Sequence, residues 1–141
     1  MRRITQLGIA AVFAICLANS APAAAEISLI GAWQHCEPVK GCLKFAFLPN
    51  GHVIEQFPLA GSVITAYGHY HIRGAMLKIG WHRFAPPKVC AAGADTNGSA
   101  DRKCISSRQD DIKGLFHFEG INSMVWSAPN APPLRLARIE L

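Results

Sequence analysis

The chain lacks the long apolar segment of a membrane-spanning protein and the charge clusters of a nucleic-acid-binding protein. Its main apolar run, residues 7–17, falls well short of the roughly 20 residues that a transmembrane helix needs. The longest basic run in residues 26–141 is Arg102-Lys103, whereas a nucleic-acid groove needs a stripe of Lys and Arg. We therefore expect neither a membrane span nor a nucleic-acid partner.

Motifs for catalysis are missing as well. The sequence contains no G-x-S-x-G, H-E-x-x-H or C-x-x-C-H pattern, which would indicate a nucleophile, a zinc protease site or a haem attachment site. Asp110 and Asp111 are adjacent and would face opposite ways on a strand, and Glu37, Glu55 and Glu119 are isolated. These absences favour a protein that is not an enzyme and uses no cofactor.

The N-terminus has the pattern of a secretory signal peptide. Arg2 and Arg3 precede the apolar run, and Ala23 to Ala25 supply small residues before Glu26. This pattern predicts cleavage after Ala25, which leaves residues 26–141 as a single domain. Such an alanine-rich leader is typical of bacterial proteins that are periplasmic or secreted. Without Arg2 and Arg3, 12 Lys and Arg face 9 Asp and Glu, which predicts a mixed surface.

Four cysteines remain after the leader: Cys36, Cys42, Cys90 and Cys104. They allow three pairings, and the simplest is sequential, with Cys36–Cys42 and Cys90–Cys104 each closing a local loop. A zinc site is the competing interpretation, but no C-x2-C spacing occurs, and an exported protein meets oxidising conditions. We therefore expect disulfides.

Turn residues and alternation predict a first hairpin over residues 43–55. Phe45 and Phe47 share one face, and Asn50-Gly51 suits a tight hairpin turn. If Asn50 and Gly51 are the two loop residues, Phe47 lies opposite Ile54. Ala46 then lies opposite Glu55, which falls on the mixed outer face.

A second hairpin is predicted to join residues 63–72 to residues 75–84 through Arg73-Gly74. In this register Ile72 pairs with Ala75. The face that it defines is apolar or small throughout: Ile72, Ala75, Tyr70, Leu77, Gly68, Ile79, Ala66 and Trp81. The opposite face is mostly polar: Thr65, Tyr67, His69, His71, Met76, Lys78 and His82.

The second half of the chain adds a loop and three strands. Residues 85–113 contain Pro86-Pro87, Gly93 and Asn97-Gly98, which predict a long surface loop tied by Cys90–Cys104. Strands are expected at residues 115–119, 123–127 and 134–141. No amphipathic helix is evident, and about eight short antiparallel strands favour a barrel or a sandwich.

Three short motifs point to a family. They are L-x-G-x-W at Leu29 to Trp33, F-x-P-[DN]-G at Phe47 to Gly51, and G-x-Y-x3-G-x2-L at Gly68 to Leu77. Together they resemble the bacterial lipocalin-like (calycin) domains, which are small exported β-barrels. The resemblance implies an all-β, antiparallel up-and-down β-barrel of about eight strands. Lipocalins usually carry a terminal helix, and none is found here, so a flattened barrel remains an alternative. The resemblance also implies an apolar interior able to hold a small hydrophobic ligand.

Large aromatic side chains are the candidates for lining such an interior. The ligand-binding candidates are Trp33, Phe45, Phe47, Tyr70, Trp81, Phe116 and Trp126, with Phe118 in the same apolar set. An ordinary packed core is the alternative, since a domain of this size needs such residues to fold.

Two further sites are weaker candidates. His69 and His71 are two residues apart and so point to the same side of a strand. They would bind Zn²⁺ or Cu²⁺ if His52 or His82 added a third ligand. The expected register disfavours this, because it places Lys78 opposite His69. The Cys36–Cys42 loop resembles the disulfide-closed loops of some exported inhibitors of lysozyme-type hydrolases, and a stapled turn is the alternative. The sequence therefore predicts a non-enzymatic binding protein for a small hydrophobic ligand or a protein partner.

Overall fold

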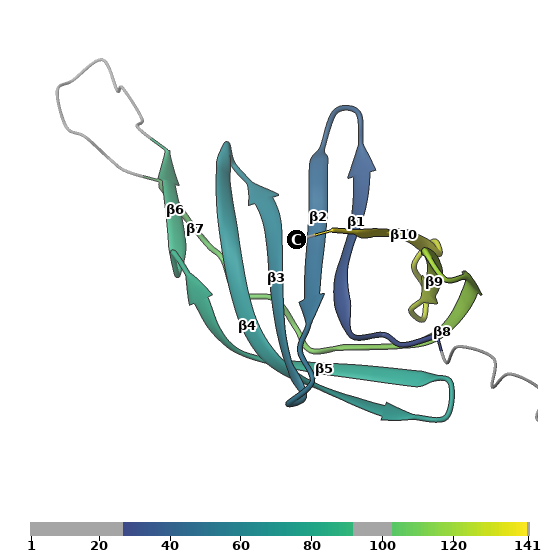
Figure 1. Ribbon diagram of the computed structural model, residues 1–141. Helices are drawn as coiled ribbons and strands as arrows, with labels where there is room; N and C mark the ends of the chain where they lie inside the picture. The colour runs from purple at the N-terminus through teal and green to yellow at the C-terminus, as the bar shows by residue number, and fades with distance from the viewer. Residues whose placement is uncertain (1–26, 92–102, 141) are drawn as a thin grey trace, which may run out of the picture.

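The computed structural model describes residues 27–91 and 103–140, and every regular element within them is a β-strand. Eight antiparallel strands close a barrel in the order β1-β10-β9-β8-β5-β4-β3-β2 (Figure 1). Their bounds are β1 Gly31–Glu37, β2 Gly41–Phe47, β3 His52–Leu59, β4 Ser62–Arg73, β5 Met76–Ala85, β8 Ile112–Gly120, β9 Ser123–Ser127 and β10 Leu134–Ile139. The expected up-and-down barrel is confirmed.

The predicted leader, residues 1–25, lies outside the described residues. Within the part of the chain that is described, no helix has the length and apolar character needed to cross a membrane.

Both expected disulfides are present, Cys36–Cys42 and Cys90–Cys104. The second one joins a separate two-stranded sheet, β6 Lys88–Ala91 and β7 Lys103–Ser106, in which Cys90 and Cys104 are direct partners. The expectation of an irregular loop over residues 85–113 is therefore wrong at this point, because two short strands pair on either side of the disulfide. This hairpin leaves the barrel between β5 and β8 (Figure 1).

The β2–β3 hairpin differs from its expected register by one residue. Phe47 lies opposite Val53, and Phe45 lies opposite Glu55. The turn is longer than a two-residue loop, because the Leu48 N–H donates to the His52 carbonyl at 2.9 Å. A shift of one residue exchanges the two faces of a strand, so Glu55 points into the barrel and not outward as predicted.

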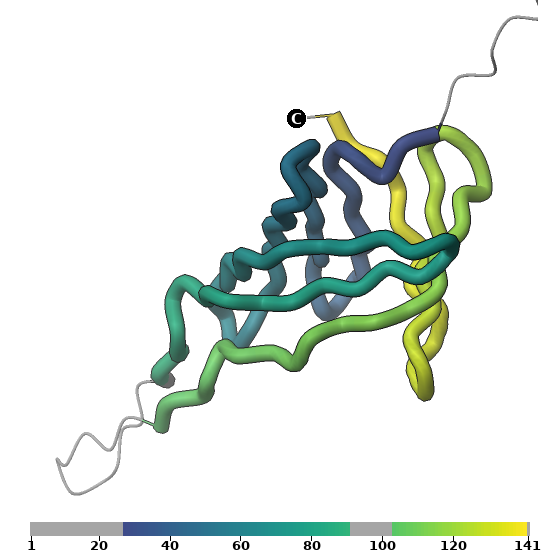
Figure 2. Tube along the Cα trace, turned by 90° about the horizontal axis from the view of Figure 1, so that it is seen from below, coloured from purple at the N-terminus to yellow at the C-terminus, as the bar shows by residue number. Residues whose placement is uncertain are grey.

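From the turn to the Gly68–Trp81 pair, the β4–β5 hairpin differs from its expected register by two residues, and beyond a bulge at that point the difference is three. Its turn is Gly74-Ala75, so that Ile72 pairs with Leu77 and Tyr70 with Ile79. A shift of two residues keeps each side chain on its own face, so Leu77 and Ile79 are buried as expected. Figure 2 shows this long hairpin crossing from one side of the barrel to the other.

The inner wall of the barrel forms one hydrophobic core. Its buried members are Leu29, Trp33, Phe45, Phe47, Val53, Leu77, Ile79, Met124, Trp126 and Leu136. Aromatic rings from different strands make contact, since Phe45 meets Trp126 edge-on with centroids 5.8 Å apart and Phe47 meets Tyr70 at 5.2 Å. The core therefore extends across the barrel, and a few polar groups are buried within it.

The mouth of the barrel and the carboxyl beneath it

An open groove of about 510 Å³ lies at the disulfide-bonded end of the barrel. The β1–β2 turn borders it with Glu37 and Lys40, and the β3–β4 turn borders it with Ala60. Leu43 of β2 and Leu134 of β10 add apolar surface from the barrel wall. The groove therefore combines a charged rim with an apolar side.

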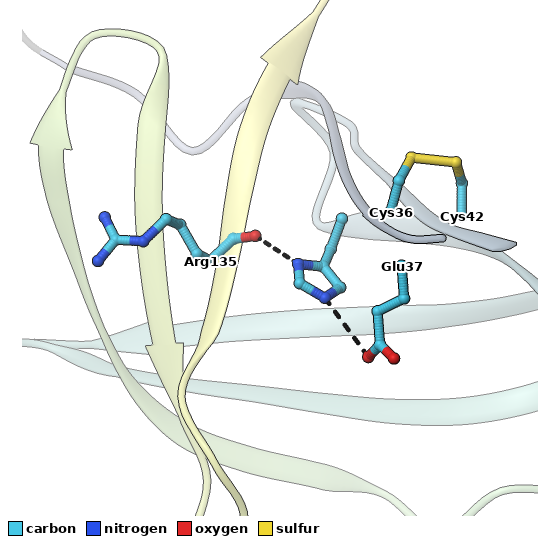
Figure 3. Close-up of a disulfide and its surroundings, with 5 residues drawn as sticks. Cys36, Glu37, Cys42 and Arg135 are labelled. Atoms are coloured by element: carbon cyan, nitrogen blue, oxygen red, sulfur yellow. Dashed lines mark hydrogen bonds and ion pairs between the residues drawn. A yellow bond between two sulfur atoms is a disulfide. The ribbon is translucent and has the colours of Figure 1, made fainter. Parts of the chain in front are cut away.

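The β1–β2 turn at this groove is held by several bonds. Cys36 and Cys42 are direct strand partners joined by the disulfide, with Cα atoms 4.0 Å apart. Lys40 Nζ lies 2.8 Å from Glu37 Oε2, and this hydrogen bond lowers the pKa of Glu37 and raises that of Lys40. The imidazole of His35 lies between the Arg135 carbonyl oxygen, 2.8 Å from Nδ1, and Glu37, 3.6 Å from Nε2 (Figure 3). The turn is thus tied to itself and to β10.

Glu55 is a buried carboxyl on the inner wall of the barrel and is not itself one of the residues that line the groove. Leu43 and Phe45 alternate onto the same face of β2, and Phe45 lies directly opposite Glu55. Glu55 is 2% exposed, and its Oε2 has no hydrogen-bond partner among the described residues. Burial raises the pKa of this carboxyl from 4.5 to about 8, so it is mostly protonated at neutral pH.

Two tryptophans on the inner wall have unsatisfied indole N–H groups. Trp81 Nε1 and Trp126 Nε1 are buried, and neither has a hydrogen-bond partner in the described part of the chain. Trp126 faces Leu134, which lines the groove, and its ring meets that of Phe45, the partner of Glu55. Buried polar atoms without partners are uncommon in folded proteins and call for an explanation.

Glycines make room for both of these indoles. A Cβ on Gly68 would lie 2.8 Å from Trp81 Cε3, and a Cβ on Gly114 would lie 2.5 Å from Trp126 Nε1. Real Cβ atoms do not approach other atoms so closely, so any larger residue would displace the rings. The two glycines thus fix where the unpaired indoles lie.

The aromatic residues predicted to bind a ligand all lie in or against the core, but they differ in their polar tips. Trp33 Nε1 donates to the Leu29 carbonyl at 2.8 Å, and the Tyr70 hydroxyl donates to the Leu48 carbonyl at 2.7 Å. Phe45 and Phe47 are buried, and Phe116 packs against the core. Trp33 and Tyr70 are therefore satisfied packing residues, and Trp81 and Trp126 are the better candidates for ligand contacts.

The histidines predicted to bind a metal lie on the outer face of β4. His71 lies opposite Lys78, and His69 lies opposite Gly80, so the expected pairing of His69 with Lys78 is wrong. Within residues 27–91 and 103–140, no three His, Cys, Asp or Glu side chains are arranged to hold a metal ion.

Glu55 is the site residue that sequence reasoning missed. In the sequence it is an isolated acid, and a two-residue turn at Asn50-Gly51 places it on the outer face. One signal was available: Glu55 alternates with Val53 on a strand whose other residues include Ile54 and Phe57, so either face of β3 was apolar enough to be buried.

Comparison with known proteins adds no relatives, since no family model matches the chain and no curated protein is significantly similar to it. The chain is therefore defined by its fold, a closed eight-stranded antiparallel barrel with two local disulfides.

Proposed function

We propose that this chain is an exported, non-enzymatic binding protein of the lipocalin-like type. It holds a small, mainly apolar ligand that enters at the groove and reaches Glu55. The observation that carries this proposal is the buried carboxyl of Glu55, one oxygen of which has no partner among the described residues. Glu55 lies opposite Phe45, the next inward-facing residue of β2 after Leu43, which lines the groove. The two disulfides are consistent with an oxidising compartment outside the cytosol.

The cost of burying these polar atoms supports a ligand. An unpaired buried polar group destabilises a folded protein by about 1–3 kcal/mol. Of the four such atoms among the described residues, one is on Ser107 between β7 and β8, and three are on the barrel strands, on Glu55, Trp81 and Trp126. A ligand that makes hydrogen bonds with them would remove that cost. Binding pockets in general combine apolar walls with a few polar groups of this kind.

The chemistry of the three groups restricts the ligand. An indole N–H only donates, and a protonated carboxyl donates one hydrogen bond through its hydroxyl. Three donors along an apolar wall fit a molecule with hydrogen-bond acceptor oxygens, such as carbonyl or hydroxyl groups, on a hydrophobic skeleton.

Native mass spectrometry of the protein, recovered from an oxidising compartment, tests the proposal. We expect an excess mass of a few hundred daltons that disappears on denaturation and identifies the ligand. The variant Glu55→Leu replaces the polar anchor with an apolar side chain of similar size, so we expect it to lose the excess mass. Glu119→Gln, which changes an exposed acid on β8, is the matched control and should retain it.

Two results would contradict the proposal. One is a wild-type protein that has only its own mass and also fails to take up N-phenyl-1-naphthylamine, an uncharged apolar fluorophore. The other is a ligand retained equally by wild type and Glu55→Leu, which would place the binding site elsewhere.

A protein partner at the β1–β2 turn is the second candidate function. Val39, at the tip of this turn, is 97% exposed, and the disulfide and the Glu37–Lys40 ion pair hold the turn around it. A rigid turn with an apolar tip loses little conformational entropy on insertion into a cleft. This geometry suits an inhibitor of a lysozyme-type hydrolase.

Inhibition assays against a panel of lysozyme-type hydrolases test the second candidate. We expect Val39→Asp to abolish inhibition, whereas Val63→Asp, at another exposed valine on β4, should leave it unchanged. Absence of inhibition by the wild-type protein would remove the lysozyme-type hydrolase from consideration.

A further inference from the structure

Three imidazole rings lie side by side on the outer face of the barrel. His52 of β3 is the direct strand partner of His69 of β4, and their ring centroids are 4.3 Å apart. The ring of His82, from β5, lies 5.1 Å from that of His69. All three side chains are exposed, and three neighbouring strands therefore contribute one ring each.

A β-bulge brings His82 into this cluster. Gly68 pairs with Trp81 and Tyr67 pairs with Arg83, so His82 is the extra residue between them. Because of the bulge, two successive side chains point outward: His82 toward His69, and Arg83 over the Tyr67 ring at 3.9 Å. Bulges often re-aim a side chain next to functional sites, and this one places the third histidine.

The position opposite His69 is open on the outer face. Gly80 occupies it, and a Cβ on Gly80 would lie 3.7 Å from Asp111 Oδ2. The other oxygen of that carboxylate, Oδ1, accepts a hydrogen bond from the Trp81 N–H at 3.1 Å. The lysine expected beside His69 lies instead opposite His71. This part of the outer face therefore carries three imidazoles and one carboxylate.

Ring spacing in the cluster matches that of histidines sharing a metal. With zinc–nitrogen bonds of about 2.1 Å and tetrahedral angles, ring centroids on one ion lie roughly 5 Å apart. The observed separations are 4.3 and 5.1 Å. The rings are tilted by 53° and 36° relative to one another, and no three of the described His, Cys, Asp or Glu side chains converge on a metal position. Exposed side chains change rotamer within nanoseconds, so reorientation is readily available.

We propose that His52, His69 and His82 bind one divalent transition-metal ion, Zn²⁺ or Cu²⁺, with Asp111 as a further oxygen ligand. Imidazole suits both ions, and Cu²⁺ is expected to bind more tightly. The four described cysteines are disulfide-bonded and so do not compete as thiolates.

This site is separate from the barrel interior, because it lies on the opposite face of the same strands. Alternation along β3 places His52 outward and Glu55 inward. Metal binding can therefore be tested whether or not the barrel holds a ligand.

Isothermal titration of the exported, untagged protein with Zn²⁺ and with Cu²⁺ tests the proposal. We expect one ion per chain, and electron paramagnetic resonance of the copper complex should show coordination by three nitrogens. His52→Ala, His69→Ala and His82→Ala should each weaken binding by at least about tenfold, as changes around metal sites do. His71→Ala and His117→Ala, at exposed histidines outside the three-ring cluster, are the matched controls and should bind as wild type.

Two outcomes would overturn the assignment. The first is the absence of saturable one-to-one binding tighter than roughly 0.1 mM for either ion. The second is binding that is lost in His71→Ala but kept in His52→Ala and His82→Ala, which would move the site to the His69–His71 pair along one strand. Circular dichroism of each variant shows whether the barrel is intact.

Discussion

Two sets of aromatic residues on the inner wall of the barrel differ in whether their polar atoms are hydrogen-bonded. The polar tips of Trp33 and Tyr70 donate to the Leu29 and Leu48 carbonyls at 2.8 and 2.7 Å. Those of Trp81 and Trp126 are buried without partners in the described residues, as is one oxygen of Glu55. The first set is hydrogen-bonded within the chain, whereas the second has polar atoms without a partner among the described residues. The difference separates residues that stabilise the barrel from residues that are suited to bind.

The largest expected effect comes from the satisfied set. Trp33 is fully buried, hydrogen-bonded to Leu29 and in ring contact with Phe118 at 5.9 Å. We expect Trp33→Ala to lower the free energy of unfolding by about 3–5 kcal/mol, because it leaves a large cavity and an unpaired carbonyl. Urea denaturation measures this loss, and a loss below about 1 kcal/mol would contradict the packing role of Trp33.

The next effect comes from Glu55 and depends on pH. Its pKa rises from 4.5 to about 8 on folding, so between these values the folded protein binds more protons than the unfolded chain. The free energy of unfolding should therefore fall as pH rises through this window, by at most about 1.4 kcal/mol per pH unit. Below pH 4.5 both states are protonated, and the penalty for burying the charge is absent.

Glu55→Gln isolates this contribution, since the amide has a similar shape and no charge. Urea denaturation of ligand-free protein at several pH values should show a smaller slope in Glu55→Gln than in wild type. Glu119→Gln, at the exposed acid paired with Arg135, should keep the wild-type slope. Equal slopes in wild type and Glu55→Gln would show that Glu55 is not a neutral buried acid.

The smallest expected effect is a difference in unfolding free energy between variants of a hydrogen-bonded and an unpaired tryptophan. Trp33→Phe and Trp126→Phe remove similar volumes, but only Trp33 loses a hydrogen bond. We expect Trp33→Phe to cost about 1 kcal/mol more in unfolding free energy than Trp126→Phe. Thermal or urea denaturation measures both, and an equal cost would mean that Trp126 Nε1 is also paired in solution.

The barrel and both disulfides could be predicted from the sequence because their signals are local. Alternation over residues 63–72 and 75–81 predicts the inward and outward faces of β4 and β5 correctly, although the expected register differs by two residues; beyond the bulge at His82 the alternation breaks. A two-residue error preserves which side chains are inside. Cys36 and Cys42, and likewise Cys90 and Cys104, are direct strand partners, so the sequential pairing was also the simplest one.

The candidate site could not be predicted, because a difference of one residue in the strand register decides which side chains face inward. The β2–β3 turn is closed by a bond from Leu48 to His52, and this one-residue difference places Glu55 inside. Hydrophobic pattern favours the opposite choice, since burying an acid is costly. The bulge at His82 is likewise invisible in alternation, and it decides which histidines meet.

The protonation state of Glu55 tests the account most directly. Carbon-13 NMR of the side-chain carboxyl, assigned by comparison with Glu55→Gln, reports its titration in the intact, ligand-free protein. We expect a pKa of about 8, because burial disfavours the charged carboxylate. A pKa near 4.5 would show a hydrated or paired carboxylate, and would contradict the interior binding site built on it.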